Sequence, residues 1–314
     1  MNKLTDNTLA CFDYFQKLWE HLLLQLEKHR FEKFRERHEL KRICGAVEAI
    51  VQGTDARLRG VCSYQKQLHE CACKLLHHIE DLVDSMPPSV LVDSTTLVSD
   101  PLVRTLFSDD ETTQRLLIRN RDIRTYFNAV DHANRDELFA LLLLHHKEKT
   151  ILGTEMRGEM IVREVRQTTF CFYGHRLVGF SASEEAVRTE MMITLFECVL
   201  RYIKSQYIEL KRDLLKQQNN YLLNHPEENI NNPEVYIKLL IQQLNFPKQL
   251  VKLTENPVRM SRMGIKLPLD SALSSNLIRL HELQVADDET SLVRMIRYPR
   301  DGLSARTLSS ATFI

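Results

Sequence analysis

Residues 61–84 read VCSYQKQLHECACKLLHHIEDLVD, and this stretch decides the fold that the sequence predicts. Its apolar residues recur at alternating intervals of four and three, which keeps them on one helix face, as in the seam of a coiled coil. We therefore predict a helix over about 55–84. The seam positions, all apolar except the glutamine, are Val61, Gln65, Leu68, Ala72, Leu75, Ile79 and Leu82.

A second apolar stripe precedes this helix in the sequence. It predicts a first helix over about 5–51, and Gly53 is a natural stop for that helix. The connection to the next helix is so short that the two must fold back antiparallel. We therefore predict a long helical hairpin over residues 1–85. The residues of the stripe are Phe12, Phe15, Trp19, Leu22 and Leu26.

Residues 86–100, with Pro87-Pro88, are predicted to form a linker, after which the sequence favours short helices. Asp100 followed by Pro101 is typical of a helix start, since Asp caps the free amides and Pro fits the first turn. The run from Phe139 to Leu144 is apolar all round, which predicts a helix buried on several sides. The predicted helices cover about 101–107, 110–129 and 135–149.

A change of period indicates strands next. Segments rich in β-branched and aromatic residues, with a turn at Gly174-His175, predict a small antiparallel β-meander at about 158–180. Ser181 with Glu184 forms a capping box, so a long helix should follow over 182–221. The strands of the meander are expected at Met160–Val165, Thr168–Tyr173 and Arg176–Phe180.

The C-terminal part should mix helices and short strands. Helices are expected to start at Pro233 and Pro247, and three strands follow. The predicted fold class is α+β, mainly α-helical, with three domains: the hairpin 1–85, a central helical domain 100–223 with the meander, and a small α/β region 231–314. The predicted strands are Met263–Leu267, Leu277–Leu283 and Leu292–Tyr298.

Composition limits the classes of function. The chain has 42 basic residues (lysine and arginine) and 42 acidic residues (aspartate and glutamate), so its formal net charge is zero. No electric field of the whole protein therefore attracts nucleic acid or anionic lipid. Seven cysteines without framework spacing favour free thiols and a reducing compartment. The longest apolar run, Leu138 to Leu144, falls far short of the roughly 20 residues of a membrane span. We therefore expect a cytoplasmic protein without a membrane span.

One helix face carries potential metal ligands. His69, Cys73 and His77 are spaced by four residues along the predicted second helix, and His and Cys at this spacing can chelate zinc. An exposed polar face explains the same pattern without a metal, and a row on one helix lacks ligands from a second element. The sequence thus predicts no cofactor, with zinc at these residues as the alternative.

A group of arginines is the candidate nucleic-acid site. Arg115, Arg119, Arg121 and Arg124 have few acidic neighbours and could contact phosphates. Aromatic residues that could stack on bases are not interleaved with them. Nucleic-acid binding therefore ranks third among the functions that the sequence suggests.

The hairpin gives the leading functional hypothesis. Two helices bury only one face of each against the other, so its further apolar residues need another surface to cover them. We therefore predict a non-catalytic protein–protein interaction, regulatory or scaffold protein, with a protein partner or a homo-oligomer bound at Phe15, Trp19 and Leu22. An enzyme or metal-dependent protein without a recognisable motif is the alternative, because active-site residues can be scattered along a chain.

Overall fold

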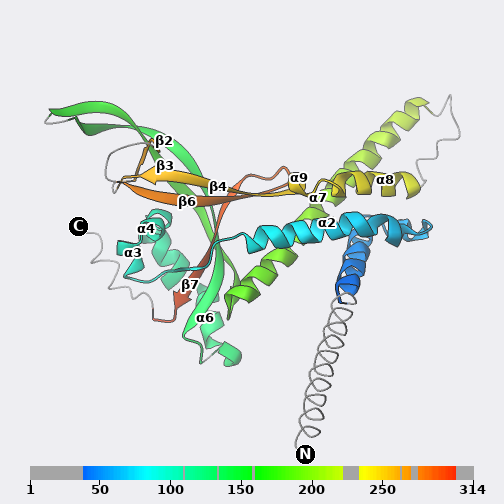
Figure 1. Cartoon of the computed structure of the whole chain (residues 1–314), viewed down its shortest axis with the longest axis horizontal. Helices are drawn as coiled ribbons and strands as arrows, with labels where there is room; N and C mark the ends of the chain where they lie inside the picture. The colour runs from blue at the N-terminus through cyan, green and yellow to red at the C-terminus, as the bar shows by residue number, and fades with distance from the viewer. Residues whose placement is uncertain are drawn as a thin grey trace, which may run out of the picture. The chain divides into compact units, whose positions relative to one another are not determined.

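The computed structural model of the chain describes residues 38–108, 110–132, 134–157, 160–221, 233–261, 264–269 and 275–301. It divides into two compact units (Figure 1). Unit 1 comprises Met1–Lys74 and Lys211–Gln242, and unit 2 comprises Leu75–Leu210 and Gln243–Ile314. Helices α2 (Tyr64–Asp84) and α7 (Glu184–Tyr221) each pass from one unit into the other.

The predicted fold class is wrong. The structure is 51% helical and 33% strand, and a seven-stranded mixed sheet holds the long-range contacts. A long N-terminal hairpin is not shown, because the stripe from Phe12 to Leu26 lies outside the described residues. The sheet was underestimated because residues 137–149 were assigned to a helix and no strand was predicted at residues 251–260.

Unit 1 contains helical residues 38–54, the 3-10 helix η1 (Ala56–Gly60), the start of α2 and helix α8 (Pro233–Leu244). The predicted start of the second helix at 55 is replaced by η1, because the Asp55 side chain caps that turn by accepting from the Arg57 amide at 3.0 Å. Ser63 then takes a positive φ of 59°, which separates η1 from α2. The buried residues of this unit include Val47, Ile50, Leu58, Leu68, Tyr236 and Ile237.

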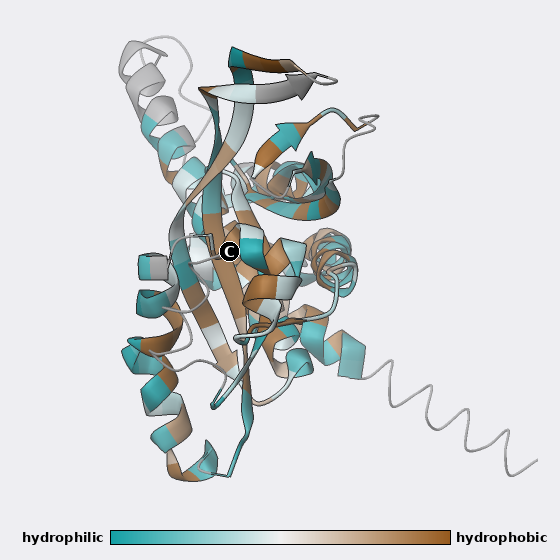
Figure 2. Ribbon diagram, turned by 90° about the vertical axis from the view of Figure 1, so that its left-hand side faces the viewer, coloured by the Kyte–Doolittle hydropathy of each residue, from teal (hydrophilic) through white to brown (hydrophobic). Residues whose placement is uncertain are grey.

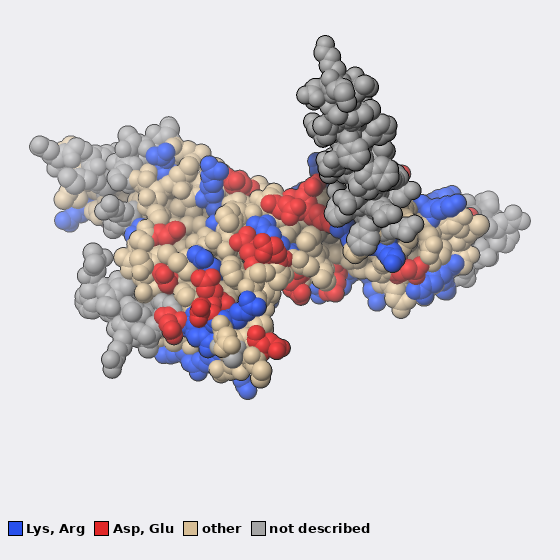
Figure 3. Space-filling view, turned by 60° about the horizontal axis from the view of Figure 1, so that its bottom comes forward, with Lys and Arg blue, Asp and Glu red and all other residues tan. Residues whose placement is uncertain are grey.

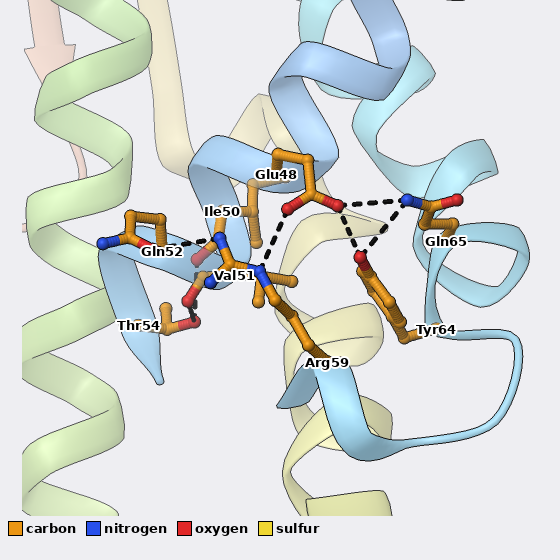
Figure 4. A network of polar contacts seen from close by, with 8 residues as sticks. All are labelled: Glu48, Ile50, Val51, Gln52, Thr54, Arg59, Tyr64 and Gln65. Atoms are coloured by element: carbon orange, nitrogen blue, oxygen red, sulfur yellow. Dashed lines mark hydrogen bonds and ion pairs between the residues drawn. The ribbon is translucent and has the colours of Figure 1, made fainter. Parts of the chain in front are cut away.

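A polar network ties the helical residues 38–54 to the turn and to α2 within unit 1 (Figure 4). Glu48 accepts hydrogen bonds from the Tyr64 hydroxyl at 2.5 Å and from Gln65 Nε2 at 3.1 Å, and it pairs with Arg59 Nε at 3.2 Å. These hydrogen bonds, led by the one from Tyr64, hold the pKa of the Glu48 carboxyl below its usual value.

Unit 2 is organised by the sheet, whose strands follow the order β1-β7-β2-β3-β5-β4-β6. The last strand, β6, also pairs with β7, so the sheet closes on itself. All pairs are antiparallel except β1 with β7. The strands are β1 (Val90–Leu91), β2 (Glu137–Arg157), β3 (Met160–Ser181), β4 (Val251–Met260), β5 (Ile265–Leu267), β6 (Asn276–Val285) and β7 (Ser291–Pro299).

Strand β2 occupies the segment that the sequence assigned to a helix over 135–149. Strands β7 and β3 flank it, and Leu138, Leu142 and Leu144 are almost fully buried. A strand buried on both faces reads as a continuous apolar run, which its sequence alone does not distinguish from a buried helix. Hydropathy colouring shows this as hydrophobic brown along the central strands (Figure 2).

The predicted meander is also corrected, because one continuous strand, β3, replaces its three short strands. β2 and β3 form a long curved ribbon, green in Figure 1. Gly174-His175 is a β-bulge instead of a turn: both residues lie opposite Leu144, and Gly174 takes a φ of 68°. A glycine with positive φ suits a bulge as well as a turn. Gly179, with a φ of 66°, forms a second bulge.

Short helices join β1 to β2, and the sequence predicted helices in part of this region. Asp100 caps α4 by accepting from the amides of Leu102 at 2.8 Å and Val103 at 3.1 Å, which confirms the predicted start. The single helix predicted over 110–129 is instead broken into three elements. The helices are α3 (Thr96–Ser99), α4 (Pro101–Leu106), α5 (Asp110–Thr113), the π-helix η2 (Gln114–Ile118), α6 (Arg121–Asn128) and the 3-10 helix η3 (Val130–His132).

The remaining elements lie closer to the positions that the sequence predicted. Helix α7 covers almost the whole predicted range, although Ser183 caps it in place of Ser181, since Ser183 Oγ accepts from the Ala186 amide at 3.3 Å. α8, the short helix α9 (Pro247–Leu250), β6 and β7 lie where they were expected. β4 was not predicted; its Pro257, a residue type that argues against a strand, nevertheless pairs with Arg279 of β6.

Candidate functional site

The predicted partner-binding residues Phe15, Trp19 and Leu22 lie outside the described residues. The structure therefore does not place them, and their role stays a prediction.

The predicted metal ligands His69, Cys73 and His77 lie on α2, spaced as the sequence indicated. Within the described part of the chain, no group of three or more His, Cys, Asp or Glu side chains is arranged to hold a metal ion. The neighbouring His78 has a structural contact, since its Nε2 lies 2.8 Å from the Val251 carbonyl oxygen. Zinc binding at the three residues stays a prediction.

The four candidate arginines are all exposed, on η2, on α6 and in the turn between them. Arg124 has a structural contact as well, because its Nη2 donates to the Ile118 carbonyl at 3.0 Å and so holds the end of η2. Basic and acidic side chains are interspersed on the face drawn in Figure 3. Nucleic-acid binding by these arginines stays a prediction.

A cavity lies in unit 2, between the first half of α7 and one face of the sheet. Its volume is about 370 Å³. Leu141 and Leu143 of β2 form its floor, where they pair with Val178 and Arg176 of β3. The full lining is Leu141, Leu143, Arg176, Val178, Gly179, Val187, Glu190, Met191, Thr194, Leu195, Cys198, Leu283, Val285, Asp288, Glu289 and Ser291.

Apolar side chains form both walls of this cavity. α7 contributes Val187, Met191 and Leu195, which are four residues apart and therefore share one helix face. Leu283 and Val285 of β6 contribute from the sheet. Predominantly apolar walls with a few polar groups are typical of small-molecule sites, whose volumes run from roughly 300 to 1,000 Å³.

Polar groups are placed around these walls. Glu289 accepts a hydrogen bond from the Tyr173 hydroxyl at 3.2 Å, and this bond raises the pKa of Tyr173 above its usual value. Cys198 Sγ lies 2.9 Å from Arg201 Nη2. The lining thus combines carboxylates, the Arg176 guanidinium and a thiol with a mainly apolar interior.

The bulge at Gly179 helps to shape the cavity. A Cβ placed on Gly179 would make an ordinary van der Waals contact with Glu190 Cγ on α7, at 3.8 Å, so space alone does not require glycine. The positive φ of Gly179 is what favours glycine there. A bulge also bends its strand and re-aims the side chains beside it, such as Val178.

The sequence did not single out this cavity as a site. The sequence of α7 did carry a pattern typical of a cavity wall, in which an apolar row runs beside a polar row at the same spacing of four residues. The apolar row is Val187, Met191 and Leu195, and the polar row is Glu190, Thr194 and Cys198. The sequence could not indicate the wall formed by the sheet, because Leu141 and Leu143 were assigned to the helix predicted over 135–149. The cavity needs both the strand and its pairing with β3.

Comparisons of the chain with protein-family models, with curated proteins and with solved structures give no match. Among the described residues, no helix has the length and apolar character that crossing a membrane requires.

Proposed function

We propose that the chain is a non-catalytic binding protein that holds a small amphipathic molecule between α7 and the sheet. The observation that carries the proposal is the cavity of about 370 Å³ with apolar walls and a few polar side chains. An apolar ligand body would remove wall surface from water, which contributes about 25 cal/mol per Å². The ligand's polar end would meet the charged side chains of Arg176 and Glu289.

The size of the cavity favours a small molecule as the occupant over a protein segment. Its volume is near the lower end of the range for small-molecule sites. A protein partner, by contrast, covers roughly 800 Å² on each side of a stable interface. The proposal keeps only the non-catalytic part of the function expected from the sequence, and a protein partner at Phe15, Trp19 and Leu22 stays a separate prediction.

Binding can be tested with three probes of equal chain length and different head groups: 1-octanol, octanoate and octylamine, titrated into the full chain by isothermal calorimetry. We expect at least one probe to bind. Thr194→Trp, an exposed lining position on α7, should fill the cavity and weaken that binding tenfold or more.

Ile193→Trp is the matched control, since Ile193 is exposed on the same helix and does not line the cavity. It should bind like the unmodified chain. If no probe binds, or if both tryptophan variants bind equally well, the proposal is wrong.

A further inference from the structure

The cavity between α7 and the sheet has more negative than positive charge on its lining. Glu190, Asp288 and Glu289 contribute three carboxylates, and Arg176 contributes one guanidinium. Three negative charges and one positive charge give the lining a formal charge of −2. All four residues are exposed, so these charges lie toward the opening of the cavity and the apolar side chains form its interior.

The turn between β6 and β7 holds two of these carboxylates in place. Tyr202 of α7 donates to Asp287 Oδ2 at 3.1 Å, and Tyr173 of β3 donates to Glu289 Oε1 at 3.2 Å. The turn is therefore connected both to the helix and to the sheet that form the walls of the cavity. Asp288 lies between the two anchored residues, so its position beside the cavity is fixed before a ligand arrives, which lowers the cost of binding.

Two of the three carboxylates are available to a ligand. Within the described part of the chain, neither Glu190 nor Asp288 has a side-chain hydrogen bond or an ion pair. Arg176 has no carboxylate of the described residues within ion-pair distance either. An anionic head group would thus find one opposite charge on the lining, whereas a cationic head group would find three.

Charges just outside the lining reduce this excess but do not reverse it. Arg201 Nη2 lies 2.9 Å from Cys198 Sγ, and Lys147 Nζ lies 5.6 Å from the centre of the Tyr173 ring. The carboxylate of Asp287 adds a negative charge on the other side of the balance. The lining carboxylates act on a bound head group most strongly, because the energy between charges falls with distance and with screening by salt.

We propose that the ligand of this cavity is an amphipathic amine, an inference that rests on the proposed function and specifies the class of molecule. Its apolar chain lies between α7 and the sheet, and its ammonium group meets the carboxylates at the opening. An ammonium group has three N–H donors and no acceptor, which suits carboxylates that only accept. A fatty acid of the same length would bring a like charge to Glu190, Asp288 and Glu289, and like charges disfavour binding.

The test compares octylamine, 1-octanol and octanoate at pH 7 by isothermal calorimetry with the full chain. We expect octylamine to bind at least about fivefold more tightly than octanoate, with octanol between them, since exposed ion pairs contribute little each. If octanoate binds as tightly as octylamine or more tightly, the amine inference is wrong and the cavity remains a binding site. If none of the three binds, the proposed function itself is wrong.

A double variant tests the carboxylates directly. Glu190→Gln with Asp288→Asn should weaken octylamine binding roughly fivefold. Octanol binding should be unchanged, which also shows that the cavity is intact in the variant. The matched control is Glu185→Gln with Glu197→Gln, because both are exposed on α7 outside the lining and the net charge changes equally. Equal octylamine affinities of the two double variants would overturn the inference.

Salt dependence of the unmodified chain gives a measurement that needs no variant. Raising the salt concentration from about 0.01 M to about 1 M shortens the screening length from roughly 30 Å to 3 Å. Octylamine binding should weaken severalfold over this range, and octanol binding should not weaken. An octylamine affinity that salt leaves unchanged would also overturn the inference, because the ammonium group would then not contact the carboxylates.

Discussion

Arg188 Nη2 lies 2.8 Å from Glu184 Oε1, one turn earlier on α7, and the same guanidinium donates to the carbonyl oxygens of Val83 and Met86. Glu184 in turn accepts from the Ser89 amide at 2.9 Å. The Arg188–Glu184 pair therefore connects the end of α2 and the residues that follow it to the start of α7. The same part of α7 forms one wall of the large cavity, so this contact fixes that wall.

Replacing Arg188 should destabilise unit 2. Arg188→Met removes the cationic partner of Glu184, which keeps only the Ser89 amide, and the side-chain donor to the carbonyls of Val83 and Met86. The loss should cost about 2–3 kcal/mol of unfolding free energy. Urea denaturation measures the loss. Lys204→Met, an exposed position on the same helix, is the control and should stay within about 0.5 kcal/mol. Equal effects of the two variants would contradict the role of Arg188.

Glu184 should make stability depend on pH in acid. Burial acts to raise the pKa of its carboxyl, but hydrogen bonds from Ser89 and Arg188 outweigh burial and leave the pKa below its usual 4.5. A depressed folded-state pKa gives stability that is complete above the unfolded value of about 4.5 and is lost as pH falls through the lower folded value.

Glu184→Gln removes this titration. The variant should be less stable than the unmodified chain at pH 7, and the difference should shrink as the pH is lowered from 5 to 3. Chemical denaturation at several pH values measures this. A difference that stays constant over that range would show that Glu184 does not titrate with a depressed pKa.

The β-bulge at Gly174 should require glycine. Its φ is 68°, and an added Cβ would meet His145 Cδ2 at 3.1 Å, so Gly174→Ala combines backbone strain with a tight contact. We expect a loss of about 1–3 kcal/mol in thermal or chemical unfolding. Gly60→Ala is the control, because no atom lies within 4 Å of its added Cβ and its φ is not positive. A harmless Gly174→Ala would refute the bulge geometry.

Burial along β2 should decide the effect of truncating its leucines. Leu142 is fully buried, so Leu142→Ala should cost about 2–5 kcal/mol of unfolding free energy. Leu152, farther along the same strand, is 68% exposed, and Leu152→Ala should cost well under 1 kcal/mol. Chemical denaturation of both variants measures the contrast. Similar losses at the two positions would contradict the burial of β2.

The sequence by itself determined those elements whose signal is local. The cap at Asp100, the prolines at positions 101, 233 and 247, and the long amphipathic run of α7 each act within a few residues, so α4, α7, α8 and α9 could be predicted. β6 and β7 were also predictable, because their composition favours strands. Within the candidate site, only the α7 wall carried such a signal.

Tertiary structure alone decided the sheet and the cavity. The run Leu138–Leu144 is compatible with a buried helix or a buried strand, and the pairing of β2 with β7, more than 140 residues away, selects the strand. Gly174 and Gly179 are compatible with turns or bulges, and the register between β2 and β3 selects bulges. Long-range backbone hydrogen bonds make these choices, because a buried strand must satisfy its amides and carbonyls on neighbours that its own sequence does not contain.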